Sequence, residues 1–352
     1  MTLDPRLKLG AAALALAGAG YAIHQADVAT RVTRVEDAFP EATYLAATLD
    51  VVALKSSPVF GVLFGPDSGR VFGLRDLEAR CGFDPADRMD RIGFVVPEKG
   101  DKGEFGAAFR VRATGEELSR CAAGGGDGAG AGTMKKEGRF FVVETPRSGA
   151  RIAYRPDNAS GGVLLLGKGD WLAEMTAALE GRAPRIGAGA AHGGLLRRLD
   201  AAGPLTLRLT VALPRDTRER IRGEMARKSA NTAASLARMS GVLGVEAAGL
   251  GVALGPDVST LRVELTCETP DDCASTKGLI DETRFKLQKD IVARLVAGPF
   301  IDALEVTLDG TTLSARTAGR TEDLARAISR VLERGGPVDP GEILGDRARK
   351  RP

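Results

Sequence analysis

The stretch from Ala247 to Leu265 constrains the fold most, because it has the pattern of two strands joined by a tight turn. Apolar residues run into Gly255-Pro256-Asp257, and Leu261, Val263 and Leu265 then alternate with polar residues. A period of two places these side chains on one face of a strand, and Gly and Pro favour turns. The stretch therefore predicts an antiparallel hairpin.

A second hairpin pattern lies upstream, from Arg91 to Val111, and each of the two is followed by an acidic helix start, at Thr114 and at Thr269. Strands of period two need one face covered, and helices of period 3.6 need a sheet to cover. We therefore expect an α+β protein. We expect two tandem similar units, each with antiparallel sheets and with helices packed on one side. An N-terminal hydrophobic helix is expected to precede them.

The expected units span residues 40–190, with a Gly-rich loop at 124–132, and residues 204–335; a disordered tail follows at 336–352. Alternating apolar residues predict strands at 43–49 and 205–211, and a hairpin at 304–315 with Asp309-Gly310 as its turn. One long helix is expected from residue 271 to residue 296.

The N-terminus has the sequence pattern of a targeting segment. Arg6 and Lys8 precede an uncharged run at residues 9–23, which as a helix spans roughly 22 Å. That length suits a signal anchor or a signal peptide within residues 1–23. We expect an uncleaved single-pass inner-membrane anchor and a helical stalk at 24–39 that leads to a periplasmic domain in the cell envelope. The alternatives are cleavage near Ala19, which frees the protein into the periplasm, and a buried soluble helix.

Four cysteines agree with export, because an even number of cysteines in an exported chain is typical of disulfides. Five residues separate Cys267 from Cys273, so a local bridge can close this turn. Cys81 and Cys121 lie in the first unit. Of the three possible pairings we favour 81–121 with 267–273; four free buried thiols are the alternative.

Composition excludes several classes of function. The net charge is only +3 and charges of both signs are interspersed, so we expect no nucleic-acid partner. The two histidines, His24 and His192, leave little material for acid–base catalysis or for a zinc site. We therefore expect no metal and no cofactor.

Two local patterns resemble functional motifs and are better explained as structure. Residues 162–169 match most of a phosphate-binding loop, but no Ser or Thr follows Lys168, and bulky strand formers fill the loop positions. Asp84, Asp87 and Asp90 are spaced by three around Pro85, which suits turns and helix caps better than a calcium site. An enzyme that uses these carboxylates is a third functional hypothesis.

The residues from Cys81 to Val96, which begin Cys-Gly-Phe-Asp-Pro and end in a strand, resemble a stretch in uncharacterised exported proteins of GC-rich Gram-negative bacteria. Those proteins also carry an N-terminal hydrophobic segment. The resemblance implies a location in the cell envelope and brings no activity or functional residue with it.

These observations favour a non-enzymatic, membrane-anchored extracytoplasmic protein that acts as a scaffold or binds a partner in the envelope. The membrane is contacted through residues 9–23. The alternative is a carrier of a lipid or another apolar ligand held between sheet and helices, where small residues such as Ala248, Gly249 and Gly251 leave room.

Overall fold

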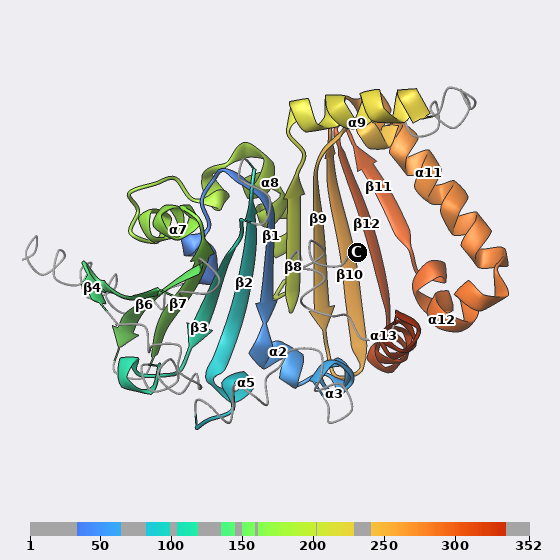
Figure 1. Ribbon diagram of the computed structural model, residues 1–352. Coiled ribbons are helices and arrows are strands. Elements are labelled where there is room, and N and C mark those ends of the chain that lie inside the picture. Colours follow the sequence, from blue (N-terminus) through green and yellow to red (C-terminus); the bar gives the residue numbers. More distant parts are fainter. Residues whose placement is uncertain are drawn as a thin grey trace, which may run out of the picture. The chain divides into compact units, whose positions relative to one another are not determined.

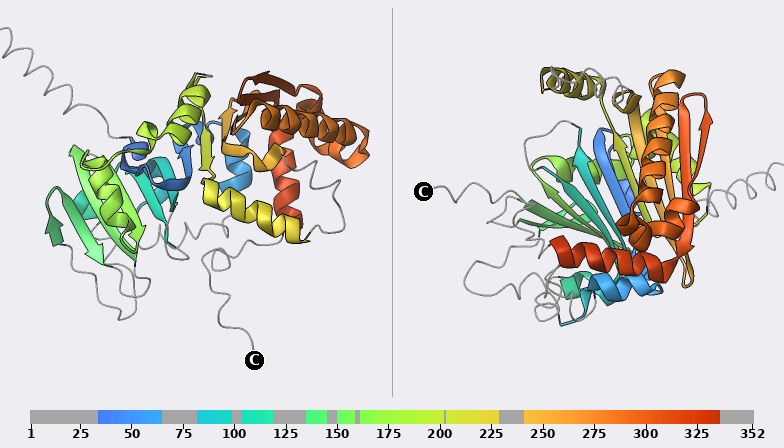
Figure 2. Two further views of the ribbon diagram at one scale, coloured as in Figure 1. Left: turned by 90° about the horizontal axis from the view of Figure 1, so that it is seen from above. Right: turned by 90° about the vertical axis from the view of Figure 1, so that its right-hand side faces the viewer.

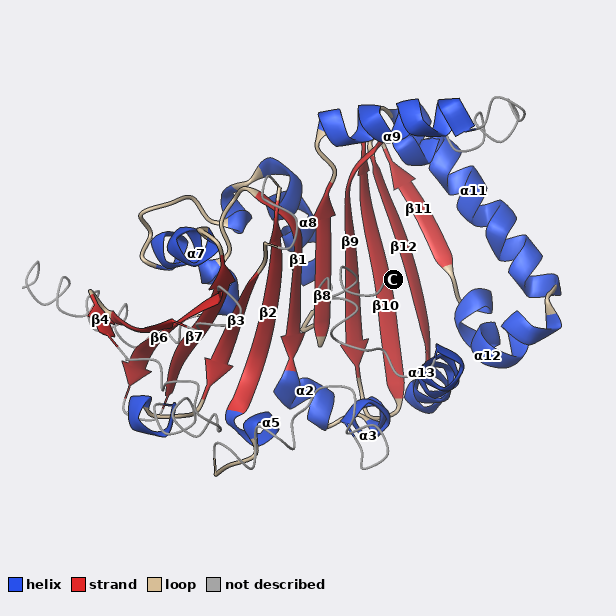
Figure 3. Ribbon diagram, in the orientation of Figure 1, coloured by secondary structure: helices blue, strands red, loops and turns tan. Residues whose placement is uncertain are grey.

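The protein is α+β, and its described strands form one antiparallel sheet (Figures 1 and 3). The structure is a computed structural model that describes residues 34–64, 82–98, 104–118, 135–144, 150–158, 161–201, 203–228 and 241–335. Within these residues twelve strands follow one another in the order β11-β12-β10-β9-β8-β1-β2-β3-β7-β6-β5-β4.

The strands are β1 (Thr43–Asp50), β2 (Met89–Pro97), β3 (Gly106–Val111), β4 (Lys135–Glu137), β5 (Phe140–Glu144), β6 (Ala150–Asn158), β7 (Gly161–Lys168), β8 (Leu207–Ala212), β9 (Val245–Leu254), β10 (Val258–Cys267), β11 (Glu305–Asp309) and β12 (Thr312–Arg320). The helices are η1 (Val35–Ala38), α2 (Val51–Lys55), α3 (Pro58–Phe64), α5 (Pro85–Arg88), α7 (Trp171–Leu179), η2 (Ile186–Ala188), α8 (Ala190–Asp200), α9 (Arg215–Lys228), α11 (Pro270–Lys289), α12 (Ile291–Asp302) and α13 (Thr321–Gly335). The hairpins expected around residues 247–265 and 304–315 are present as β9–β10 and β11–β12. The turn of the second hairpin is Gly310-Thr311 and not Asp309-Gly310, because Asp309 pairs with Thr312 in the ladder.

The sheet is continuous across the two halves of the chain because β1 pairs with β8 in its middle. Outwards from this ladder the order is β1-β2-β3-β7-β6 on one side and β8-β9-β10-β12-β11 on the other. In each half a first strand is followed by a hairpin, and the last hairpin of each half has its later strand inside. The first half also contains the β4–β5 pair at the end of the sheet. The strands of residues 40–190 and those of residues 204–335 therefore belong to one sheet.

Cross-strand partners point to the same side of a sheet, so the register separates its two faces. Gly249 lies beneath Leu195 and Leu199 of α8, and its partners across β8 and β1 are Thr210 and Ala46. We call this side the α8 face; η1 and α7 lie on it as well. The other side is the α13 face, named for the helix that lies across one end of β10 and β12 in Figure 1.

Helices cover both faces, so the prediction that they pack on one side is wrong for the sheet as a whole. On the α13 face, α11 packs on Leu313 and Leu265, and Phe300 of α12 packs against Gly319. The physical reason is that the strands are apolar at odd and even positions alike. Leu164, Leu165 and Leu166 of β7, for example, are consecutive.

Glycines on the α8 face let helices approach the strands closely. A Cβ atom at Gly106 would lie 2.4 Å from Met175 Sδ, and one at Gly93 would lie 2.4 Å from Phe39 Cζ. At Gly167 the nearest atom is the backbone nitrogen of Leu172, at 2.5 Å. Real Cβ atoms do not approach other atoms so closely, so helix α7 and the segment around η1 require glycine at these positions.

The end of the predicted stalk belongs to the core. Val35, Ala38 and Phe39 are at most 1% exposed, and they pack against Val95 and Ala46 of the sheet. The prediction of a stalk to residue 39 is therefore wrong for residues 35–39, where three apolar side chains at helical spacing are buried instead of exposed. Residues 1–33, with the expected anchor, lie outside the described residues, as do the Gly-rich loop at 124–132 and the tail at 336–352.

The single helix expected from residue 271 to residue 296 is two helices. Thr269 caps α11, because its side chain accepts a hydrogen bond from the backbone N–H of Asp272. Asp290 then has extended backbone dihedrals (φ −81°, ψ 117°) and accepts a hydrogen bond from Ala293 N–H. It therefore ends α11 and caps α12. The helix α8 occupies most of the segment between the two expected units, residues 191–203.

The close contacts at the glycines of the α8 face predict that substitution there lowers the free energy of unfolding. We expect Gly167→Ala to destabilise the protein by about 1–3 kcal/mol, because the new methyl group meets backbone atoms of α7 that cannot rotate away. Gly223→Ala in α9 is the matched control. Its Cβ meets no atom within 4 Å, so the variant gains about 0.5–1 kcal/mol of helix propensity. Urea unfolding measures both changes, and an equal effect of the two substitutions would contradict this packing.

Candidate functional site

The local disulfide predicted for the second unit is present. Cys267 ends β10 and Cys273 lies in the first turns of α11, with the two sulfurs 2.00 Å apart and the Cα atoms 5.6 Å apart. Beside the bridge, Glu268 accepts hydrogen bonds from Arg222 and Arg218. The bond from Arg222, followed by the charge of Arg218, holds the pKa of its carboxyl group below the usual value. Cys81 and Cys121 lie outside the described residues, so their pairing stays a prediction.

The three spaced aspartates are not gathered around a common point. Asp87 accepts a hydrogen bond from Lys55 at 2.7 Å, and this contact lowers the pKa of Asp87. Asp90 pairs with Arg112 at 2.8 Å. Two of the three carboxylates thus have separate cationic partners, as structural side chains do.

The room expected near Gly249 and Gly251 is filled. Leu195 and Leu199 of α8 lie over Gly249, and Leu199 and Leu205 lie over Gly251, within 4 Å of where a Cβ atom would be. The small residues therefore serve close helix packing. This corrects the reason for expecting a ligand beneath α8.

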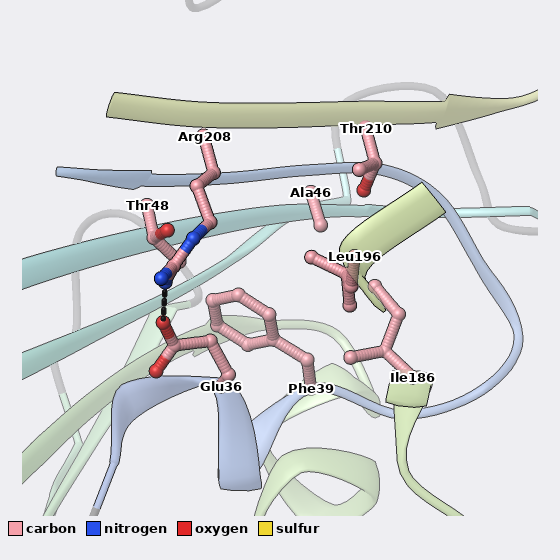
Figure 4. A pocket seen from close by; sticks show the side chains of 8 residues that line it. All are labelled: Glu36, Phe39, Ala46, Thr48, Ile186, Leu196, Arg208 and Thr210. Carbon is pink, nitrogen blue, oxygen red and sulfur yellow. Dashed lines mark hydrogen bonds and ion pairs between the residues drawn. The ribbon is translucent and has the colours of Figure 1, made fainter. Parts of the chain in front are cut away.

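A small cavity, lined mostly by apolar atoms, lies between η1, α8 and the strands β1 and β8 (Figure 4). Arg208 of β8 donates a hydrogen bond to Glu36 of η1 at 3.2 Å, and both side chains line the cavity. Glu36 Oε2 and Arg208 Nε are buried without a partner. The cavity volume is about 10 Å³, which is room for one water molecule and too little for an organic ligand.

His192 is buried nearby, where α8 crosses β1 and β8. Its Nε2 lies 2.7 Å from the carbonyl oxygen of Thr43, and its Nδ1 lies 2.8 Å from Thr210 Oγ1. A carbonyl oxygen only accepts, so Nε2 carries the proton and Nδ1 accepts from the hydroxyl group. Burial lowers the pKa of the imidazole, and the hydrogen bond to Thr43 and the charge of Glu98 oppose this shift less strongly. The neutral ring is a structural clamp.

A fully buried carboxylate lies on the α8 face of β10. Glu264 is 0% exposed and accepts hydrogen bonds from Arg198 of α8, from Arg262, and from Ser314 of β12. Both carboxylate oxygens have donors, and Arg198 also bonds Thr266. The cluster ties α8 to the sheet. Sequence reasoning missed it, because Glu264 looked like a solvent-facing residue of an alternating strand.

The strongest candidate for a functional surface is the part of the α13 face that lies over β1–β3 and β5–β9. On these strands the residues of the α8 face are buried: Val95, Ala108 and Leu165 are each 0% exposed. Of their apolar neighbours on the α13 face, some are buried (Ala107, Val111, Val143, Tyr154 and Val252). The others are only half-buried, and Phe94 is 38% exposed. The half-exposed apolar side chains are Leu45, Ala47, Ile92, Phe94, Val96, Phe105, Phe109, Phe141, Ile152, Leu164, Leu166, Leu209, Val211 and Leu250.

The character of this face is unusual for an antiparallel sheet. A sheet with one solvated face alternates apolar and polar residues, whereas these strands are apolar on both sides. Phe94 of β2 stacks on Phe105, the residue that precedes β3, with ring centroids 5.8 Å apart. Contiguous exposed apolar surface marks a binding site in soluble proteins. The signal in the sequence is the run of consecutive apolar residues in strands such as β7, where Leu164, Leu165 and Leu166 follow one another.

A second apolar feature is a groove where α11 and α12 diverge near the start of β11. Leu279, Ile280 and Leu287 of α11 and Ile301 and Leu304 line it, and its volume is about 250 Å³. Thr283 and Arg284 complete the lining. Beyond the groove, at the turn between the helices, Phe285 is 58% exposed and Ile291 is 76% exposed.

Two further findings concern the described residues only. They contain no group of three or more His, Cys, Asp or Glu side chains arranged to hold a metal ion. No helix among them is both long enough and apolar enough to cross a membrane.

No protein-family model matches the chain, and no curated protein matches it. Among solved structures, three crystal forms of TP0453 are similar. Form III has a TM-score of 0.47 at 10% identity and covers 84% of this chain and 98% of that chain. Forms I and IV have TM-scores of 0.46, at 8% and 10% identity, and each covers 86% of this chain. A likeness at this level carries no argument about function.

The clamp at His192 predicts a pH dependence. Because burial lowers the pKa in the folded protein below the ordinary value of 6.5, the unfolded chain takes up the proton more readily. The contribution of neutral His192 to the free energy of unfolding is therefore complete above pH 6.5 and is lost as the pH falls below this value. We expect the free energy of unfolding to decrease between about pH 7.5 and about pH 5.5. Urea unfolding at several pH values measures this decrease.

His192→Gln is the comparison, since its amide can still donate to Thr43 but does not titrate. The loss of stability in this pH range is expected to be smaller for the variant than for the natural chain. Parallel pH profiles of the two proteins would rule out the clamp as the source.

Proposed function

We propose that the protein is a non-enzymatic binding protein of the cell envelope, which holds a lipid or another apolar ligand against its α13 face. The single observation that carries this proposal is the half-exposed apolar side chains that continue across β1–β3 and β5–β9. Burying an apolar ligand against them removes apolar area from water, at about 25 cal/mol per Å². The ligand then lies beside the helices of the α13 face and not beneath α8.

The wider arrangement that we propose follows the sequence. Residues 9–23 are a signal anchor in the inner membrane, or a signal peptide cleaved near Ala19, and the sheet lies in the periplasm. The disulfide between Cys267 and Cys273 supports an oxidising compartment. The strand order β1-β2-β3-β7-β6 matches β8-β9-β10-β12-β11, apart from the additional strands β5 and β4 in the first half. This match supports an origin as two tandem similar units. The helices that follow the last strand differ in side, since α7 lies on the α8 face and α13 on the other.

A second candidate function is a scaffold that contacts an envelope protein. The exposed apolar side chains at the turn between α11 and α12, Phe285 and Ile291, favour it. A helical turn with large apolar side chains in solvent is a common form of protein contact.

Apolar binding is tested at Phe94. We expect Phe94→Lys to weaken binding of a fluorescent fatty-acyl probe about tenfold, because a cation on the α13 face must be desolvated by an apolar ligand. Val258→Lys is the matched control, since Val258 is 55% exposed but lies on the α8 face of β10. Fluorescence titration measures binding, and mass spectrometry of the purified protein identifies lipid that co-purifies. Equal affinity of the two variants would place the site elsewhere.

The envelope location is tested by the intact mass of the protein from membrane and soluble fractions of its host, after alkylation without reductant. We expect a full-length, membrane-bound species lighter by two disulfides. A soluble species that starts near Gly20 would replace the anchor with a cleaved signal peptide. A full-length soluble protein with four alkylated cysteines would overturn the proposed export.

A further inference from the structure

The strand β11 ends the sheet, and among the described strands it pairs only with β12. The right-hand view of Figure 2 looks onto this edge from the side of β11. Glu305, Thr307, Leu308 and Asp309 are exposed, and Val306 is half-buried. One edge of β11 is therefore paired with β12, and its other edge is accessible.

The hairpin turn decides which backbone groups point outwards. Asp309 and Thr312 flank a two-residue turn, Gly310-Thr311, in which Gly310 has a φ of +55°. The pair that flanks such a turn exchanges both hydrogen bonds, so Asp309, Thr307 and Glu305 bond to β12. On the far side of β12, Cys267 N–H donates to the carbonyl oxygen of Thr311, as this register requires. The N–H and C=O groups of Val306 and Leu308 consequently point away from the sheet.

The side chains of β11 are sorted by face. Glu305, Thr307 and Asp309 lie on the α8 face, opposite Arg316, Ser314 and Thr312. Val306 and Leu308 lie on the α13 face, opposite Ala315 and Leu313. One face of the edge is thus acidic at both ends, and the other is apolar.

An apolar groove continues the apolar side of the edge. Leu304, two residues before Val306, lines the groove of about 250 Å³ between α11 and α12, together with Ile301 and Leu287. A strand added beside β11 places its alternate side chains next to Leu308, Val306 and Leu304. The third of these side chains lies at the groove.

We propose that the β11 edge binds an extended segment of a partner protein, which adds to the sheet as an antiparallel strand. The fitting segment has the pattern basic–apolar–any–apolar–basic–apolar. Its two basic side chains lie beside Asp309 and Glu305, and its last apolar side chain enters the groove. Strand addition of this kind takes affinity from backbone hydrogen bonds and specificity from alternate side chains.

A second copy of this chain is the wrong occupant. Antiparallel pairing of two β11 strands around Thr307 puts Glu305 of each copy opposite Asp309 of the other, and like charges directly opposite are destabilising. The acidic ends thus disfavour self-association in this register and favour a basic partner. The inference deepens the scaffold function and names its site; it is independent of the apolar ligand on the α13 face.

The test uses the full chain and the labelled peptide acetyl-Lys-Val-Thr-Val-Lys-Leu-amide, with fluorescence anisotropy as the readout. A peptide with Glu in place of both Lys residues is expected to bind at least about tenfold more weakly. In the chain variant Glu305→Lys with Asp309→Lys the preference is reversed. The variant Glu116→Lys with Asp257→Lys changes the net charge equally at exposed acids away from β11, and it keeps the original preference.

A backbone variant tests the hydrogen bonds. Leu308→Pro removes an outward N–H and leaves the bonds to β12 in place, so the variant folds and peptide binding falls at least about tenfold. Far-ultraviolet circular dichroism and the intact disulfide report folding, and if this variant does not fold, the charge reversal still decides. Absence of binding to the natural chain, equal binding of the two peptides, or a dimer of the natural chain that Leu308→Pro dissolves would each overturn the proposal. If the peptide test fails but an envelope protein is crosslinked at Phe285 or Ile291, the scaffold function stands and only the β11 site is ruled out.

Discussion

The ladder between β1 and β8 holds the rest of the molecule together, because it is the contact that makes one sheet from two halves. Backbone hydrogen bonds along Leu45–Leu49 and Leu207–Val211 form it. Polar contacts reinforce it on the α8 face, where His192 bonds both strands and Arg208 reaches Glu36. Each of these groups is buried or half-buried, so a partner lost from one side leaves a desolvated polar group on the other. The junction is therefore specified by side chains as well as by the ladder.

Much of the strand architecture could be predicted from the sequence, since period-two alternation and Gly/Pro turns are local signals. The hairpins at β9–β10 and β11–β12 and the Cys267–Cys273 bridge are examples. The break at Asp290 was missed because a lone aspartate among apolar helix formers is locally compatible with one long helix. Its role as a cap depends on the direction in which α12 packs, which is a tertiary property.

The faces of the sheet were harder to predict than its strands. Consecutive apolar residues such as Leu164–Leu166 indicate burial on both sides, but they do not say which helix covers which side or how completely. The role of the glycines on the α8 face was equally hard to predict. The sequence does not tell whether Gly249 leaves a space or admits a leucine. The α13 face emerges only when the register and the burial of alternate residues are compared. Of the three spaced aspartates, Asp87 pairs with Lys55 and Asp90 pairs with Arg112.

The β1–β8 ladder also has a consequence for how the protein folds. β1 is complete early in synthesis, but its partner β8 follows roughly 160 residues later, a separation that slows folding in two-state domains. Until then the first half presents β1 as an unpaired apolar edge, a state prone to mispairing and aggregation. The β1–β8 ladder can form only after both halves have been synthesised. Its most vulnerable moment is thus the interval between the emergence of the first half and the closure of the centre of the sheet.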